Sequence, residues 1–240
     1  MTKRIITQDD VKALGTILFV GAHPDDETFT AGGLLAAAAQ NGQTVIVVTA
    51  TLGEGGIQDE SRWPAAELGA IRTAELGQAL KILGCTHHYW LDYHDGECAT
   101  DSPDRAISRI AEVIAQHQPD TILTFGPDGL TGHPDHRAVS GWVAKANHNK
   151  AQVYHVVEAQ ETYEKYLSKA DQQFNWYFNI PEPPVMPADE CAIALKLSAE
   201  SREAKLEALR AMPSQYDKFF TTVPSDLLEN LFTVECFVRV

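Results

Sequence analysis

Short runs of almost continuously apolar residues alternate along this chain with longer stretches whose apolar positions recur at helical spacing. Five apolar runs are typical of strands that are buried on both faces, at residues 16–22, 43–50, 87–91, 119–125 and 152–158. The stretches between them predict helices at residues 27–42, 64–84, 104–117 and 134–147. This alternation predicts an α/β fold, with a Rossmann-like, doubly wound, mostly parallel sheet that carries helices on both faces.

A proline-rich segment at residues 179–190 separates this predicted core from the last part of the chain. That last part predicts a strand at 191–197, a helix at 198–212 and a strand at 232–240. It is too short to bury a hydrophobic core of its own. We therefore predict a single domain over residues 1–240, with a core at about 1–178 and a C-terminal strand-helix-strand extension at about 179–240.

The tripeptide H-P-D occurs twice, after the first and after the fourth predicted strand. Residues 23–25 form the first copy and Asp26 follows it, while residues 133–135 form the second copy and His136 follows it. In the common strand order 3-2-1-4-5, the first strand lies beside the fourth, and ligands bind outside the carboxyl ends of the strands. We therefore expect the two tripeptides to face each other, although 110 residues separate them along the chain.

These residues predict a catalytic metal site. Zinc accepts His and Asp as ligands, and a catalytic zinc ion takes three protein ligands and a water molecule. The proposed ligands are His23, Asp26 and His136. Asp25 and His133 then remain beside the ion, the first as a general base and the second as a group that polarises a carbonyl or protonates a leaving amine. Either motif alone has a simpler explanation, such as a helix cap, but two linked motifs at adjacent strand ends favour catalysis.

Composition and charge argue against several classes of binding partner. The 19 basic and 33 acidic residues give a formal charge of −14 without a basic stripe, which argues against nucleic acid and anionic membranes. No apolar run reaches the length of a membrane span, and the first residues lack the apolar core of a signal peptide, so we place the chain in the cytoplasm. No glycine motif for a nucleotide phosphate follows the first strand, which disfavours a nicotinamide cofactor.

The motifs resemble those of the PIG-L/LmbE-like family of zinc-dependent N-acetylglucosamine deacetylases and related amidases. The chain carries A-H-P-D-D-E at residues 22–27 and H-P-D-H at residues 133–136. Further similarity lies in T-L-G-E-G-G at 51–56, I-R-T-A-E-L at 71–76 and K-L-E-A-L-R-A-M-P-S-Q at 205–215, in the order of the family. The resemblance therefore extends over most of the chain.

The resemblance implies roles for individual residues. His23, Asp26 and His136 would bind zinc, with iron or another divalent metal able to take its place. Asp25 would be the general base, and His133 would assist the transition state. Arg72 would bind sugar hydroxyls, and Asp95 and Asp135 are further candidates for contact with the substrate.

Two positions depart from the family pattern. Thr131 stands where deacetylases of the mycothiol pathway carry a tyrosine, and Met212 stands where a histidine often precedes the S-Q element. Neither change removes a metal ligand, but both bear on the identity of the substrate.

We expect a zinc-dependent hydrolase that removes an N-acyl group, above all acetyl, from an N-acetylglucosamine-type or other amino-sugar-containing small molecule. Three alternatives stay open. One is an amidase that acts on a thiol conjugate or another acylated amine. Another is a non-haem Fe(II) enzyme, whose facial triad also consists of two His and a carboxylate. The last is a binder without catalytic activity, although such a protein does not need Asp25 and His133. The C-terminal extension also offers a surface for homo-oligomer formation.

Overall fold

The computed structural model describes Arg4 and residues 6–240, apart from the side chains of Asp226 and Glu229. Residues 1–3 and 5, which belong to the predicted domain, lie outside the described residues. The strands are β1 (Ile17–Gly21), β2 (Val45–Thr51), β3 (His87–Tyr93), β4 (Thr121–Thr124), β5 (Gln152–Ala159), β6 (Val185–Met186), β7 (Ile193–Lys196) and β8 (Val234–Arg239). The helices are η1 (Gln8–Leu14), α1 (Asp26–Gln40), α2 (Leu68–Ile82), α3 (Asp104–His117), α4 (Pro134–Asn147), α5 (Gln160–Thr162), η2 (Tyr163–Leu167), α6 (Ser168–Phe174), α7 (Ala199–Arg210), α8 (Pro213–Thr222) and α9 (Ser225–Leu231).

Among the described residues, one sheet runs in the order β3-β2-β1-β4-β5-β8-β7, and β6 pairs with the end of β5. Strands β1 to β5 are parallel, whereas β8 is antiparallel to both β5 and β7. The predicted α/β fold and the order 3-2-1-4-5 are confirmed, and β1 pairs directly with β4. The C-terminal segment extends the same sheet, while its assignment to a single domain over 1–240 stays a prediction.

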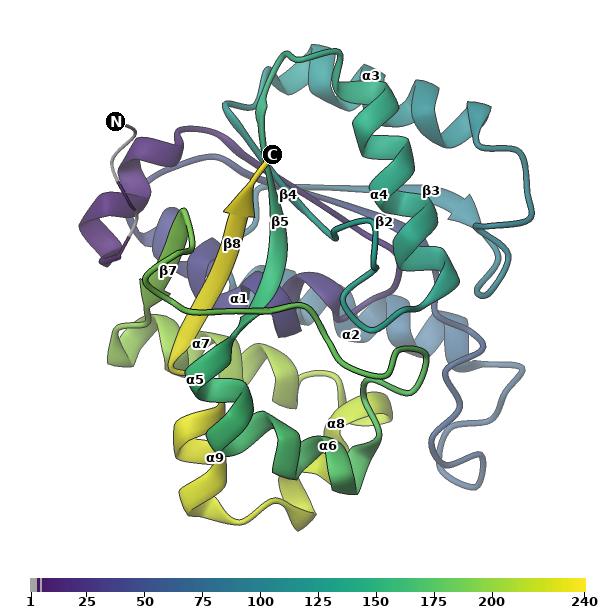
Figure 1. Ribbon diagram of the computed structural model, residues 1–240. Helices are drawn as coiled ribbons and strands as arrows, with labels where there is room; N and C mark the ends of the chain where they lie inside the picture. Colours follow the sequence, from purple (N-terminus) through teal and green to yellow (C-terminus); the bar gives the residue numbers. More distant parts are fainter. Residues whose placement is uncertain (1–3, 5) are drawn as a thin grey trace.

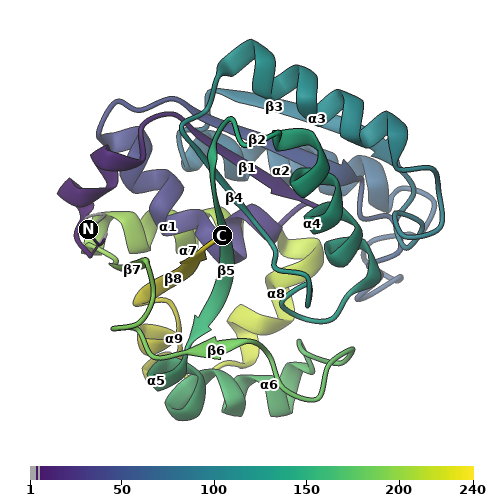
Figure 2. The same cartoon turned by 45° about the horizontal axis from the view of Figure 1, so that its top comes forward.

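Helices cover both faces of the sheet. Helices α3 and α4 lie on one face, and α1, α2 and α7 lie on the other (Figures 1 and 2). Every residue of β1 and β2 is buried. This explains why the sequences of these strands are apolar throughout, with no alternation of apolar and polar residues. In the described part of the chain, no helix is long and apolar enough to cross a membrane.

The structure contains helices that the sequence pattern did not predict. Residues 160–174 form α5, a π-helical turn and α6, and residues 213–231 form α8 and α9, so that three helices rather than one lie between β7 and β8. Isolated helices of this length are marginal in water. Here they are stabilised by packing, because Leu167, Phe219 and Phe232 belong to one buried apolar cluster. These helices matter for function because they supply one wall of the site described below.

A buried ion pair attaches this C-terminal region to the core. Lys205 of α7 donates to Glu235 of β8 over 2.7 Å, and both side chains are buried. The same carboxylate accepts the backbone N–H groups of Gly33 (2.9 Å) and Leu34 (2.7 Å) in α1. One carboxylate therefore links a strand and two helices.

Replacing Lys205 by methionine is expected to lower the free energy of unfolding by about 3–5 kcal/mol, because the Glu235 charge would stay buried without its cation. Chemical denaturation measures this change. Arg210→Met is the matched control, because the Arg210–Glu203 pair lies on the exposed side of the same helix and its loss is expected to cost about 0.5 kcal/mol or less. Equal effects of the two substitutions would contradict the buried-pair interpretation.

Candidate metal centre and active site

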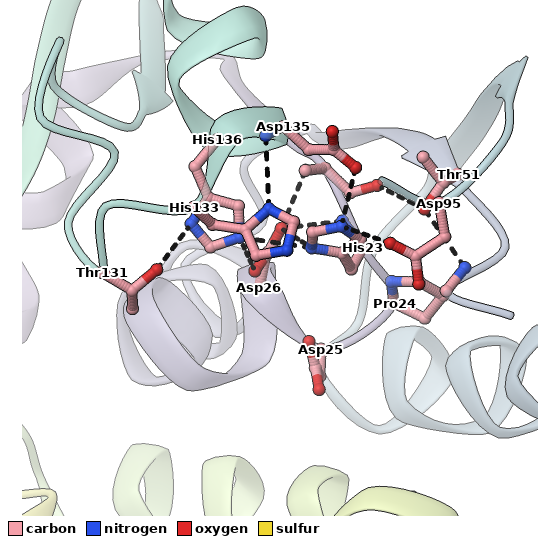
Figure 3. A network of polar contacts seen from close by, with 12 residues as sticks. His23, Pro24, Asp25, Asp26, Thr51, Asp95, Thr131, His133, Asp135 and His136 are labelled. Carbon is pink, nitrogen blue, oxygen red and sulfur yellow. Dashed lines mark hydrogen bonds and ion pairs between the residues drawn. The ribbon is translucent and has the colours of Figure 1, made fainter. Parts of the chain in front are cut away.

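The two H-P-D motifs meet at the carboxyl edge of the sheet, as the strand order predicts. The first follows β1 and the second follows the loop after β4, and Asp95 joins them from the loop after β3. Figure 3 shows His23, Asp26 and His136 pointing toward one another from these separate segments. Residues that are distant in sequence thus share one cluster because parallel strands end at the same edge.

The contacts of His136 with His23 and Asp26, two of the three contacts among the predicted metal ligands, have separations close to those around a tetrahedral ion. The Nε2 atom of His136 lies 3.2 Å from Nδ1 of His23 and 3.3 Å from Oδ1 of Asp26. Nδ1 of His23 lies 3.8 Å from the second oxygen of Asp26. Ligand atoms placed about 2.1 Å from a tetrahedral ion stand about 3.4 Å apart. The geometry therefore fits a divalent metal, and the ligand set stays a prediction.

The outward-facing atoms of these ligands are held by hydrogen bonds. Nε2 of His23 lies 3.2 Å from Asp135 and 3.1 Å from Asp95, and Nδ1 of His136 donates to the carbonyl of Gly129 over 2.9 Å. Oδ2 of Asp26 accepts two backbone N–H groups, each over 2.8 Å. Metal-bound histidines characteristically donate their other N–H to a carboxylate or carbonyl, which fixes the ring and its tautomer. Both imidazoles thus present a lone pair to the centre.

The cluster favours positive charge. Burial opposes protonation of His23, but the hydrogen bonds with Asp135 and Asp95 and the charge of Asp26 outweigh it and raise the pKa of His23 to about 10. Burial also disfavours the carboxylate of Asp26, yet the charges of His136 and His23 outweigh this and lower the pKa of Asp26. A site that stabilises an extra proton on its ligands is also suited to a divalent cation.

His133 belongs to the same group but differs from the two ligand histidines. Its Nδ1 accepts the backbone N–H of Asp135 over 3.2 Å, so the proton of the neutral ring is assigned to Nε2. Burial and the neighbouring His23 lower the pKa of His133 to about 4, which keeps it neutral near pH 7. Together with His23 and His136 it forms an alternative set of metal donors. As a neutral donor it instead suits the predicted role in the transition state.

Asp25 is held in an unusual backbone conformation directly before α1. Its φ of 117° lies in the left-handed region, which a residue with a Cβ rarely adopts, and such strain concentrates at functional sites. Its carboxylate lies 3.2 Å from the guanidinium of Arg72. Burial raises the pKa of Asp25 to about 6, and the charge of Arg72 limits the rise. A carboxylate with this pKa suits a general base near neutral pH.

Arg72, the predicted sugar ligand, is buried beneath the H-P-D-D turn and is 4% exposed. It donates to the carbonyl of Pro24 and, over 2.8 Å, to that of Gly53. Gly53 has a φ of +68°, and a Cβ there would lie 2.3 Å from Nη1 of Arg72, so only glycine permits this approach. Although the guanidinium borders the cavity, its contacts favour positioning of Asp25, and sugar binding by Arg72 stays a prediction.

Replacing Arg72 by glutamine is expected to move the acidic limb of the kcat/KM–pH profile to higher pH by about one unit, because Asp25 would lose the cation that favours its charged form. Activity requires the carboxylate, so it rises as pH rises through the pKa of Asp25. Arg72→Lys keeps the charge and is expected to leave the limb near its original position. An unchanged limb in the glutamine variant would contradict the coupling, provided that circular dichroism shows a folded protein.

Asp95 and Asp135 occupy different places relative to the cavity. Asp95 borders it and also accepts the backbone N–H of Gly55 over 2.9 Å. Asp135 is fully buried and accepts the N–H groups of Gly96 (2.7 Å) and Cys98 (3.1 Å) in addition to its contact with His23. This geometry favours orientation of His23 over the predicted contact between Asp135 and the substrate.

The two positions that depart from the family pattern also differ in setting. Thr131 borders the cavity, with its hydroxyl 3.4 Å from Nδ1 of His136. Met212 is buried in the apolar cluster under α7 and α8, away from the cavity lining. Of the two substitutions, the threonine is therefore the one placed to affect the substrate.

A cavity of about 480 Å³ opens over the cluster, and we call it the polar chamber. Besides the predicted site residues, it is lined by side chains that the sequence did not single out, namely Gln58, Trp176, Phe178 and Gln215. Gln215 lies in the S-Q element of the resemblance, and its amide donates to the carbonyl of Gly56 over 2.9 Å. No periodicity or motif marks Trp176 and Phe178, which reach the cavity from the segment after α6.

The family model that matches this chain is PIG-L, described as GlcNAc-PI de-N-acetylase, and the match spans residues 18–147, more than half of the chain. The chain belongs to the PIG-L family. The predicted membership is thus confirmed, and with it the prediction of an enzyme, because the PIG-L family and the curated relatives are named as deacetylases. The match includes both H-P-D motifs.

A curated relative supports the family assignment, and solved structures share the fold. The 1D-myo-inositol 2-acetamido-2-deoxy-alpha-D-glucopyranoside deacetylase of Mycobacteroides abscessus is 32% identical over 226 residues, which cover 83% of this chain and 81% of that protein. The N,N'-diacetylchitobiose deacetylase from Pyrococcus horikoshii has a similar fold, with a TM-score of 0.62 at 23% identity over 95% of this chain and 85% of that one. The teicoplanin deacetylase Orf2 has a TM-score of 0.63 at 18% identity, covering 94% and 98% of the two chains.

Proposed function

We propose that this PIG-L family member is a zinc-dependent hydrolase that removes an acetyl or other acyl group from the nitrogen of an N-acetylglucosamine-type substrate. The observation that carries the proposal is the orientation of His23 and His136. Their outer nitrogens are engaged in hydrogen bonds, and their inner nitrogens lie 3.2 Å from each other and 3.8 Å and 3.3 Å, respectively, from the carboxylate of Asp26. The names of the relatives, which act on acetamido sugars, support the substrate class.

The residues around the centre have separate roles in the hydrolysis. Bound zinc would polarise the acyl oxygen and make its water molecule more acidic. Asp25 takes a proton from the attacking water and delivers it to the nitrogen as the C–N bond breaks. His133, neutral and with its proton assigned to Nε2, donates to the oxygen on which negative charge develops. The products are a carboxylate and a free amine.

Release of acetate tests the proposal. The purified protein, first freed of metal and then loaded with zinc or with Fe(II), is incubated with a panel of N-acetylated sugars, including N-acetylglucosamine-inositol conjugates. The same panel includes acylated thiol conjugates and simple acylated amines. Zinc-dependent acetate release from the sugars is the expected result. Hydrolysis confined to the other amides would change the substrate class, and oxygen consumption with Fe(II) and no hydrolysis would overturn the proposal.

A further inference from the structure

A second, apolar cavity opens beside the metal centre. Its volume is about 120 Å³, and we call it the aromatic chamber, defined by Phe29, Phe125, Leu130, Trp176, Tyr177 and Tyr216. Five residues border both this space and the polar chamber, namely Asp25, Asp26, Thr131, His136 and Trp176. The predicted base Asp25 and two of the predicted ligands, Asp26 and His136, thus lie where a polar space meets an apolar one.

The walls of the aromatic chamber are built by contacts between segments that are distant in sequence. The ring of Phe29 on α1 meets Trp176 edge to face at 5.2 Å and stacks with Tyr216 of α8 at 6.4 Å. Phe125, after β4, stacks on the ring of His136 at 4.0 Å. One wall therefore rests directly against a predicted metal ligand.

Two polar groups at the edge of this chamber are turned to partners in the protein. The hydroxyl of Tyr177 donates to Glu158 over 2.8 Å, and the hydroxyl of Thr30 donates to the carbonyl of Asp26 over 2.6 Å. The chamber therefore presents mainly carbon surface away from the metal centre. A group that binds there gains from the removal of apolar area from water.

An N-acyl amino sugar, like the site, has a polar part and an apolar part. Its sugar is polar, its acyl chain is apolar, and the amide between them is the bond to be hydrolysed. With the amide at the metal centre, the sugar fits the polar chamber beside Asp95 and Gln215, and the acyl chain fits the aromatic chamber. The reverse orientation would leave the hydroxyl groups of the sugar without partners in an apolar space.

We propose that the aromatic chamber binds the acyl chain and that it accommodates chains of about four carbons, so that the enzyme prefers butanoyl to acetyl. This inference rests on the proposed function. An engineered cavity of 150 Å³ holds a benzene molecule, so a space of 120 Å³ exceeds the single methyl group of acetyl and approaches a four-carbon chain. The reaction is the same hydrolysis for every acyl group: water adds to the acyl carbon, the C–N bond breaks, the nitrogen leaves as a protonated amine and the acyl chain leaves as a carboxylate.

The test compares glucosamine carrying acetyl, propanoyl, butanoyl, hexanoyl or octanoyl groups on the zinc-loaded protein, with the freed amine as the readout. We expect kcat/KM to rise about fourfold for each added methylene up to butanoyl and to fall for octanoyl. A fall from acetyl to propanoyl would overturn the acyl-chamber proposal while leaving the proposed function intact. Absence of hydrolysis with every acyl group would instead count against the proposed function itself.

Two substitutions test whether the aromatic chamber sets the preferred length of the acyl chain. Phe29→Leu enlarges the aromatic chamber and is expected to shift the preferred chain by one or two carbons toward hexanoyl. Phe220→Leu is the matched control, because Phe220 packs on Phe219 in the same aromatic cluster but lines neither chamber, and the order of preference should stay as in the unaltered protein. Identical preferences in both variants would overturn the assignment.

A binding measurement does not depend on these variants. Butanoate is expected to inhibit the unaltered enzyme at a concentration at least tenfold lower than acetate, because two further methylenes enter the chamber. Equal inhibition by the two carboxylates would count against the acyl-chamber proposal.

Discussion

Replacing Asp25 by asparagine is expected to lower kcat about 100- to 10,000-fold while the metal stays bound. Asparagine keeps the shape of the side chain but cannot accept a proton from the attacking water, and positioned general bases contribute rate enhancements of this size. Asp25 is not one of the predicted ligands, and its carboxylate faces Arg72. The loss is therefore expected in kcat without a matching loss of metal.

The measurement pairs steady-state kinetics with metal analysis of the same preparation. Asp101→Asn serves as the control. Asp101 is an exposed residue in the loop before α3, so this substitution makes the same chemical change away from the centre. Full activity in the Asp25 variant would exclude it as the base. Loss of metal together with activity would move Asp25 into the ligand set.

Replacing Asp26 by alanine is expected to abolish stable metal binding and, with it, activity. Asp26 places one oxygen beside Nε2 of His136, and its other oxygen accepts two backbone N–H groups, so its loss removes a predicted ligand and loosens the turn that carries His23. Asp135→Asn leaves the three predicted ligands in place but weakens the hydrogen bonds of this carboxylate with His23, Gly96 and Cys98, and it is expected to weaken metal binding about 10- to 100-fold. Titration of the metal-free proteins with zinc measures both effects.

His133→Ala and Asp26→Ala together distinguish the predicted ligand set from the two other donor groups among the described residues, His23–His133–His136 and His23–Asp95–Asp135. If His23, Asp26 and His136 hold the metal, the His133 variant keeps its affinity and loses turnover. If the three histidines hold it, the same variant loses the metal, and Asp26→Ala retains it. If His23, Asp95 and Asp135 hold it, both variants retain the metal, so the pair of variants separates all three sets.

The site was predictable from the sequence where it depends on short motifs and strand order. Continuous apolar runs fixed a sheet buried on both faces, and the order 3-2-1-4-5 brought His23 and His136 together. The nitrogen that each histidine turns inward was not predictable, because it depends on partners such as Gly129 and Asp135 that only folding places nearby. For the same reason, the burial of Arg72 was not predictable, because the sequence alone favours a solvent-exposed position for a charged helix residue.

The amino-acid sequence by itself determined the α/β class and placed the His and Asp motifs after two buried strands, because local periodicity suffices for these. The commonest strand order of such sheets then put both motifs at one edge. Only the tertiary structure decided the aromatic chamber. Its walls come from α1, the segment after α6 and α8, and the last two belong to a region of short helices. Short helices have little intrinsic stability and form because they pack against the rest of the protein. The local pattern of apolar and polar residues therefore predicts neither these helices nor the cavity between them.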